Sequence, residues 1–207
     1  ISYTFGSGCT AVDTVTVNPL PLPVTGVITV CVGATSSLTD AGGGSWSSSN
    51  TTVAAAGSAT GVITGVAAGS ATITNKLPTG CLTTTSFYVN PLPPGITGTT
   101  TNCASKKKKK TTATSGGAWS SGSTAVATVG SSTGVVTGVS AGTARISYSL
   151  LTGCASVVTV TVNPLPSGIT GAGGVCKGST IALTDITTGG AWTSGNTSVA
   201  AIGSTGI

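Results

Sequence analysis

Six cysteines and three aspartates are the residues of this 207-residue chain whose side chains are suited to chemistry. General acid–base catalysis relies on a histidine or on carboxylates that tune one another, and the chain has no His and no Glu. Asp13, Asp40 and Asp185 lie far apart in the sequence, and no cluster of residues has the composition of a zinc or calcium site. We therefore expect no catalytic residue, no metal site and no cofactor, and this segment is not expected to be an enzyme.

The composition raises the question of disorder, because only 5% of residues are charged and Ser, Thr and Gly are abundant. Valine nevertheless alternates with threonine, as at Val158, Val160 and Val162, which is the period of a strand with one buried face. No run of 18 apolar residues occurs, so we expect no membrane insertion in this segment. Ile1 is not a natural start and no signal peptide is present, which favours an interior piece of a longer chain.

A repeat of 72 to 73 residues organises the sequence. The segment Val-Asn-Pro-Leu-Pro begins at Val17, Val89 and Val162. The same steps separate the tryptophans and two series of cysteines, which are Trp46, Trp119 and Trp192; Cys31, Cys103 and Cys176; and Cys9, Cys81 and Cys154. We predict that residues 1–18 end one repeat, that 19–90 and 91–163 are whole repeats, and that 164–207 begin another.

Each repeat has the pattern of a small β-domain. Short apolar runs that alternate with Thr, including Val15 and Val17, are separated by Gly, Asn, Asp and Ser, and no stretch has a helical period. About seven strands in 72 residues predict an antiparallel β-sandwich. The Asn-Pro-Leu-Pro segments are expected to be stiff linkers, because proline fixes φ and has no N–H for a sheet. The predicted fold class is therefore all-β, a tandem array of sandwiches.

The residues that follow each tryptophan resemble the bacterial immunoglobulin-like domain of group 2. In the second repeat the likeness runs from Trp119 to Ser123, through Val126-Ala127, and over residues 134–146. In the first repeat it covers residues 46–50, 53–54 and 61–73. The Cys-x-Gly-x-Thr and Thr-Gly-Cys elements resemble those of tandem arrays in giant secreted proteins of Bacteroidetes. The resemblance implies immunoglobulin-like sandwiches that act as spacers or adhesive modules, and it brings no catalytic residues.

The tryptophans are expected to be core anchors. A domain of about 70 residues buries only about 60% of its unfolded surface, so Trp46, Trp119 and Trp192 would supply much of the packing. The alternative is a surface on which sugars stack. The glycines of the Gly-Val-Ile/Val-Thr-Gly-Val segments are expected to adopt positive φ.

An even number of cysteines in an exported, Thr-rich chain favours disulfides. Pairing within each repeat gives Cys31–Cys81 and Cys103–Cys154. The immunoglobulin-like resemblance places those partners at opposite poles, whereas end-to-end stacking suggests Cys31–Cys154. Pairing across each linker, interchain bonds and free thiols also stay open. The candidates are Cys9, Cys31, Cys81, Cys103, Cys154 and Cys176.

The net charge of +5 is local, because five of the eight basic residues form the run Lys106–Lys110. Lys110 aligns with the presumed core residues Leu38 and Leu183, and a buried lysine without a partner is unfavourable. Three interpretations remain: a basic patch for acidic polysaccharide or DNA, a tolerated lesion in one repeat, or an error in the sequence. We expect no nucleic-acid partner, because interleaved aromatic residues and scattered arginines are missing.

Three residues are candidate glycosylation sites. Asp13-Thr14-Val15 resembles the O-glycosylation acceptor used by Bacteroidetes, which would modify Thr14. Asn50 and Asn196 each begin an Asn-x-Ser/Thr pattern. Asp40 and Asp185 are expected to be turn residues rather than ligands.

The sequence as a whole predicts a structural repeat segment of an extracellular surface or filament-forming protein, which spaces, projects or polymerises. The alternative is an adhesin module that binds glycans or host or cell-surface proteins. The low-charge surface favours self-association through the faces of the repeats into a homopolymer or fibre, and surface glycans are a second class of partner.

Overall fold

The computed structural model describes all 207 residues, and its regular elements are eighteen β-strands, β1 to β18. The predicted all-β fold is confirmed. No helix has the length and apolar character needed to cross a membrane. Contacts divide the chain into two compact units. Unit 1 comprises Ile1–Ile96, Thr112–Ala118 and Tyr148–Val157, and unit 2 comprises Thr97–Thr111, Trp119–Ser147 and Val158–Ile207.

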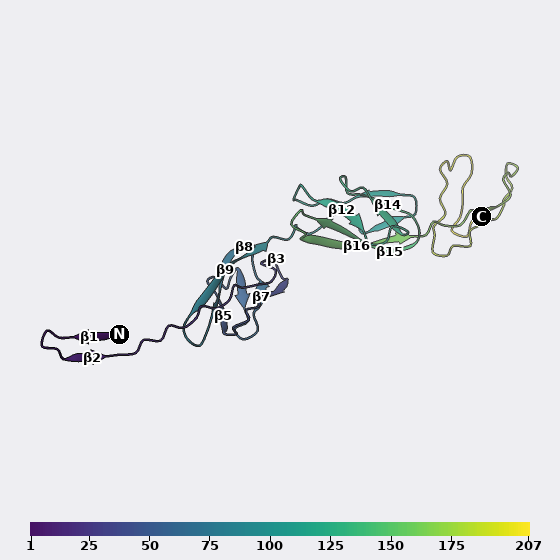
Figure 1. Ribbon diagram of the computed structural model, residues 1–207. Helices are drawn as coiled ribbons and strands as arrows, with labels where there is room; N and C mark the ends of the chain where they lie inside the picture. The colour runs from purple at the N-terminus through teal and green to yellow at the C-terminus, as the bar shows by residue number, and fades with distance from the viewer. The chain divides into compact units, whose positions relative to one another are not determined.

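Unit 1 contains a β-sandwich of two sheets (Figure 1). The four-stranded sheet has the order β3-β9-β8-β5 and the three-stranded sheet has the order β4-β7-β6. The short β3 pairs in parallel with β9, and the other pairs are antiparallel. This is an immunoglobulin-like arrangement, as the sequence predicted. Its strands are β3 (Thr29–Cys31), β4 (Thr35–Ser37), β5 (Ser45–Ser48), β6 (Ala54–Ala56), β7 (Val62–Gly65), β8 (Gly69–Lys76) and β9 (Leu82–Asn90).

The core of this sandwich follows from the two-residue period of its strands. Along β8 the buried residues alternate with Thr72 and Thr74, and along β9 the buried Phe87 and Val89 lie on either side of the exposed Tyr88, so each strand buries one face. The opposite sheet contributes Ala54 and Ile63 to the same core. The buried cluster consists of Leu38, Trp46, Ala54, Ile63, Ala71, Ile73, Phe87 and Val89.

A second sandwich, most of which belongs to unit 2, repeats this plan with the sheets β10-β16-β15-β12 and β11-β14-β13. β10 pairs in parallel with β16, as β3 does with β9. Ile146, Val160 and Val162 are almost fully buried. The strands are β10 (Thr101–Cys103), β11 (Lys107–Lys109), β12 (Ala118–Ser121), β13 (Ala127–Val129), β14 (Val135–Gly138), β15 (Gly142–Ser149) and β16 (Ala155–Asn163).

A glycine with positive φ packs against the tryptophan in each sandwich. Gly61 and Gly134 both have φ of +66°, as predicted, and a Cβ there would lie 3.1 Å from the Trp46 ring and 2.9 Å from the Trp119 ring. Another residue would be strained and would displace the ring. Gly65 departs from the prediction, since its φ is not positive. It is needed for close packing instead, because a Cβ would lie 2.9 Å from Val89.

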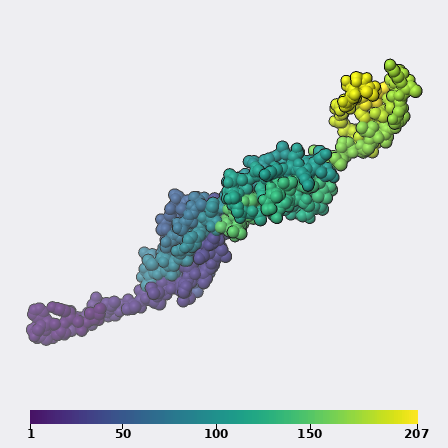
Figure 2. All heavy atoms as spheres, turned by 90° about the horizontal axis from the view of Figure 1, so that it is seen from above, coloured from purple at the N-terminus to yellow at the C-terminus, as the bar shows by residue number.

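The remaining segments form small hairpins. β1 (Ser2–Thr4) pairs with β2 (Thr10–Val12), and β17 (Thr170–Gly171) pairs with β18 (Leu183–Thr184). All residues of β1 and β2 are exposed, and Figure 2 shows this hairpin (purple) as a thin band of atoms.

The strand that we predicted through Val15 and Val17 is wrong. Both residues lie in irregular structure and are 58% and 90% exposed. A strand needs a partner for its backbone N–H and C=O groups. The β1–β2 ladder ends with the pair Ser2 and Val12, beyond which Asp13 still bonds to Ile1, so residues 14–18 have no neighbouring strand.

Candidate functional site

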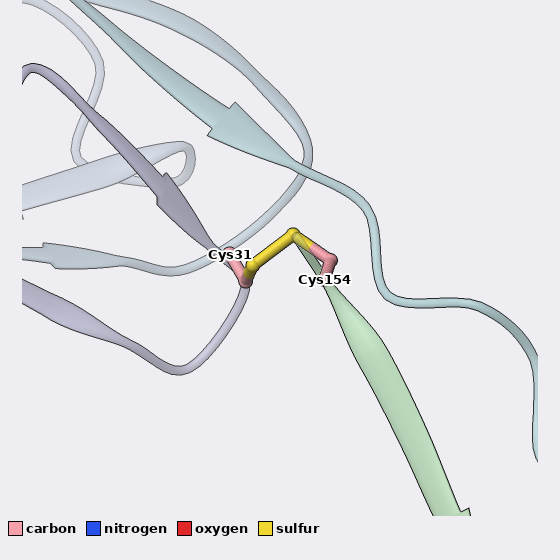
Figure 3. Close-up of a disulfide and its surroundings, with 2 residues drawn as sticks. All are labelled: Cys31 and Cys154. Carbon is pink, nitrogen blue, oxygen red and sulfur yellow. A yellow bond between two sulfur atoms is a disulfide. The ribbon is translucent and has the colours of Figure 1, made fainter. Parts of the chain in front are cut away.

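One disulfide, between Cys31 and Cys154, is the only covalent cross-link in the structure (Figure 3). Cys31 is the last residue of β3, and Cys154 immediately precedes β16. Both residues belong to unit 1, and their Cα atoms are 5.6 Å apart, within the range of ordinary disulfides. Cys154 is fully buried. The bond closes a loop between residues separated by 123 positions.

This pairing differs from two of the alternatives that the sequence left open. The structure contains neither the within-repeat pairs Cys31–Cys81 and Cys103–Cys154 nor any pair across a linker. Each complete sandwich carries one cysteine at the end of its first strand and the other immediately before its last strand. The remaining cysteines are free thiols; Cys9, Cys103 and Cys176 are exposed, and Cys81 is half-buried.

A turn of four residues presents Cys154. The N–H of Leu150 donates to the carbonyl of Cys154 at 2.9 Å, and the N–H of Gly153 donates to the carbonyl of Leu150 at 2.9 Å. Gly153 has φ of +84°, which favours glycine at this position. The Thr-Gly-Cys element therefore forms the tight turn that leads into β16.

A basic hollow of about 460 Å³ lies on the second sandwich. It is lined by Thr101, Asn102, Cys103, Lys106, Lys107, Lys108 and Asn163, a set that we call the lysine hollow. Asn102 is 4% exposed and fixes its floor, since its Nδ2 donates to the carbonyl of Lys106 at 2.8 Å and its Oδ1 accepts from the N–H of Cys103 at 3.0 Å. No acidic residue occurs between Asp40 and Asp185, so this sandwich contains no carboxylate to neutralise the lysines.

The fifth lysine of the run points into the sandwich. Lys110 is 1% exposed, and its Nζ donates to the carbonyl of Gly98 at 3.1 Å and to the carbonyl of Thr99. Burial lowers the pKa of its ammonium group, because the charged form loses its hydration. The run is therefore divided between an exposed basic surface and one buried amine.

The tryptophans differ in exposure. Trp46 and Trp119 are 8% and 7% exposed, so neither offers its ring face to a sugar. Trp192 is only half-buried and lines a hollow of about 450 Å³ together with Asp185. Its role as a core anchor is correspondingly weaker, because residues 164–207 form only the two-stranded pair β17–β18 and no second sheet covers the ring.

Two of the predicted glycosylation residues and two of the aspartates cap turns through a side-chain oxygen. Asn50 and Asn196 are exposed, and the Oδ1 of each accepts hydrogen bonds from the N–H and the hydroxyl of the residue two positions later. Asp40 and Asp185 use one carboxylate oxygen in the same way, toward the N–H of Gly42 and of Thr187. Thr14 is exposed. No group of three or more His, Cys, Asp or Glu residues in the described chain has the geometry to hold a metal ion.

Sequence reasoning missed a threonine pair that is built the same way three times. The hydroxyls of Thr25 and Thr39 lie 2.9 Å apart, and the two equivalent pairs, Thr97 with Thr111 and Thr170 with Thr184, lie 2.8 Å apart. The 72- and 73-residue steps between these threonines were the available signal. The first two pairs join the segment before the first strand of a sandwich to the segment after its second strand, and the third pair lies between β17 and β18, so the role of each pair is structural.

No family model matches the chain, and no curated protein matches it in sequence. Solved structures with a similar arrangement include a 282-residue C-terminal fragment of intimin in complex with its receptor's intimin-binding domain, at 14% identity and a TM-score of 0.45 over 72% of this chain and 67% of that one. Domains 4 and 5 of the S-layer protein SbsC give 19% identity and 0.31 over 71% and 100%. Mouse cadherin-23 domains EC22–24 give 12% and 0.30 over 70% and 65%. Such distant likenesses assign the chain to no family, and membership of the group 2 immunoglobulin-like family stays a prediction.

Proposed function

We propose that this chain is a structural repeat segment of an extracellular surface or filament-forming protein, in which residues 19–90 and 91–163 act as successive spacer units. The observation that carries the proposal is the Cys31–Cys154 disulfide. Stable disulfides are a feature of proteins outside the reducing cytosol. The same sandwich plan, built twice in one chain, supplies the repetition that a spacer or fibre requires.

The disulfide also gives the segment a mechanical property. Force applied to the two ends of the chain passes through the Cys31–Cys154 bond, because that bond is a covalent shortcut past the residues between them. A fully extended chain spans about 3.3–3.6 Å per residue, so the separation of 123 positions hides roughly 400–440 Å of length. When a sandwich of a loaded spacer unfolds, the residues between the two cysteines add no length, so the spacer lengthens little.

Single-molecule stretching tests this proposal directly. With handles at the two ends, the oxidised chain should extend by a contour length that excludes residues 32–153, and the reduced chain should release roughly 400 Å more. A chain with Cys31→Ala and Cys154→Ala should behave as reduced under all conditions. Equal contour lengths with and without reductant would contradict a load-bearing disulfide. Sedimentation of the oxidised chain over a range of concentrations tests the accompanying proposal of self-association through repeat faces.

The lysine hollow favours a second candidate function, the binding of an acidic polysaccharide. Lys106, Lys107 and Lys108 line a concave surface together with Asn102, whose side-chain amide bonds to the carbonyl of Lys106 and to the N–H of Cys103. The corresponding residues of the first sandwich are Ala34, Thr35 and Ser36, so the fold does not require the lysines. Their charges have no carboxylate partner in the same sandwich, which makes an anionic polymer the complementary ligand.

Titration with polygalacturonate, with neutral dextran as the control ligand, tests this second function. Binding should weaken with salt and should be lost when Lys106→Ala, Lys107→Thr and Lys108→Ser copy the first sandwich. A variant with Lys76→Thr and Lys177→Thr removes charge elsewhere and should bind normally. Equal binding of single-stranded DNA would show a general polyanion surface, and retention of binding by the triple variant would contradict the assignment.

A further inference from the structure

The first cysteines of the two sandwiches occupy equivalent places, although only one of them is bonded. The carbonyl of Cys31 accepts the N–H of Ala34 at 2.9 Å, and the carbonyl of Cys103 accepts the N–H of Lys106 at 3.1 Å. Each cysteine ends a strand that runs parallel to the last strand of its own sandwich. Even the turn after Cys103 is preserved, since Ser105 has φ of +60°, in the place where the first sandwich has a glycine with φ of +82°.

The second cysteines are also equivalent. The N–H of Leu77 donates to the carbonyl of Cys81 at 2.8 Å, as the N–H of Leu150 donates to the carbonyl of Cys154 at 2.9 Å. The glycine before each cysteine closes the same turn, at 3.0 Å in the first sandwich and 2.9 Å in the second. Cys81 and Cys154 therefore enter the last strands of their sandwiches through the same local structure.

The one disulfide of the structure joins two successive repeats. The first cysteine of one repeat, Cys31, is joined to the second cysteine of the repeat that follows it along the chain, Cys154. Cys103 and Cys81 have the local geometry of these two bonded residues, yet both are thiols. Exposed Cys103 has the place of a first cysteine, and half-buried Cys81 has the place of a second cysteine.

We propose that Cys103 and Cys81 are two halves of the same inter-repeat disulfide, and that each takes its partner from a further repeat of this design. Cys103 would bond to the second cysteine of a following repeat, and Cys81 to the first cysteine of a preceding one. The array would thus be stapled at every junction by bonds of the Cys31–Cys154 type. This inference rests on the proposed function, because it concerns the same tandem assembly.

The chemistry requires an oxidant, for which we name a low-molecular-weight disulfide. One protein thiolate attacks a sulfur of that disulfide, forming a mixed disulfide and releasing one small thiolate. The second protein thiolate then attacks the protein sulfur of the mixed disulfide, and the second small thiolate leaves. Two protein thiols are oxidised to one disulfide, the small disulfide is reduced to two thiols, and the two protons lost by the protein are taken up by these leaving thiolates.

The inference is tested by inserting a second copy of residues 91–163 directly after residue 163. In the inserted copy, Thr100→Ser and Leu151→Val mark the two cysteine-containing peptides by mass at exposed positions. The chain is oxidised with glutathione disulfide, digested with pepsin at acidic pH to suppress exchange, and mapped without reduction. We expect Cys31–Cys154 and a new bond from Cys103 to the inserted counterpart of Cys154. Bonds within each repeat, such as Cys103–Cys154, would overturn the inference.

A second experiment asks whether the further repeat belongs to the same polypeptide or to a second copy of the chain. The unaltered chain is oxidised over a range of concentrations, and disulfide-linked dimers are mapped. Dimers joined by Cys81 and Cys103, lost in Cys103→Ala and kept in Cys176→Ala, would show that a second copy supplies the partner. A bond in the lengthened chain without such dimers would assign the partner to the same polypeptide. The stretching experiment reads only the Cys31–Cys154 bond, so its success together with the absence of a bond from Cys103 to the inserted repeat would overturn this inference and leave the proposed function standing.

Discussion

Lys110 lies in the second sandwich at the place that Leu38 occupies in the first, and both side chains are 1% exposed. The backbone N–H of each donates to the carbonyl of the glycine that packs against the tryptophan, at 2.8 Å from Lys110 and 2.9 Å from Leu38. The lysine satisfies its buried amine with the carbonyls of Gly98 and Thr99. The fold has therefore accepted an amine in a leucine site and has kept the backbone hydrogen bond of that site.

Lys110→Leu should raise the free energy of unfolding of the second sandwich by about 1–3 kcal/mol, because it removes a buried cation and restores the apolar contact of the first sandwich. The exposed Lys108→Leu should change it by less than about 0.5 kcal/mol. Hydrogen exchange read by mass spectrometry reports the second sandwich separately from the first. Destabilisation by Lys110→Leu, with Lys108→Leu neutral, would show that the carbonyl contacts of the amine outweigh its burial.

The same lysine should make stability depend on pH. Its pKa is lowered by burial in the folded state, so between that lowered pKa and the unfolded value of about 10.5 the unfolded chain binds more protons. The free energy of unfolding should therefore rise as the pH rises through this window, and below it the full cost of the buried charge persists. Urea unfolding at a series of alkaline pH values should show this rise in the wild type and a smaller one in Lys110→Leu. Parallel profiles would contradict it.

The repeat, the strand periodicity and the immunoglobulin-like class were predictable from sequence because they depend on local alternation and on spacing, as with Val160 and Val162. The disulfide pairing at the candidate site was harder to predict from the sequence. Cys31 and Cys154 are separated by 123 positions, and only their placement in the folded chain selects their pairing over the alternatives. The strand expected at Val15 and Val17 failed for the same reason, because alternation predicts a strand only where a neighbour supplies hydrogen bonds.

Removal of the polar group of Asn75 should stabilise the first sandwich, whereas removal of the polar group of Tyr148 should destabilise the second. Tyr148 donates its hydroxyl to the carbonyl of Thr114 at 2.8 Å and accepts the N–H of Gly117 at 2.8 Å. Asn75, at the equivalent position, is fully buried and neither amide atom has a hydrogen-bond partner. Asn75→Leu should stabilise the first sandwich by about 1–3 kcal/mol, and Tyr148→Phe should destabilise the second by a similar amount. Local hydrogen exchange of each sandwich measures both, and a loss of protection in Asn75→Leu would refute the first half.

Trp119→Ala and Trp192→Ala form a matched pair, because the indole ring of Trp119 is buried and that of Trp192 is half-buried. Removal of Trp119 should cost about 3–5 kcal/mol, since it leaves a cavity between the two sheets. Removal of Trp192 should cost much less, because its ring borders an open hollow. Protection of β12 and β15 against hydrogen exchange reports the first variant, and protection of β17 and β18 reports the second. Equal losses would show that residues 164–207 pack around Trp192 more tightly than its exposure indicates.

Loss of the Cys31–Cys154 bond should lower the free energy of unfolding, because the unfolded chain gains conformational freedom. The bond closes a loop of 123 positions, and a constraint of this length restricts the unfolded ensemble by an amount worth about 2–4 kcal/mol in typical proteins. The double variant Cys31→Ala and Cys154→Ala avoids a buried unpaired thiol and should lower the urea midpoint accordingly, whereas Cys103→Ala removes a free thiol and should leave it unchanged. Reductant should lower the wild-type midpoint to that of the double variant and should not affect the double variant itself. A midpoint that ignores reductant, or one that falls equally in Cys103→Ala, would mean that the bond contributes nothing to the stability of the folded chain.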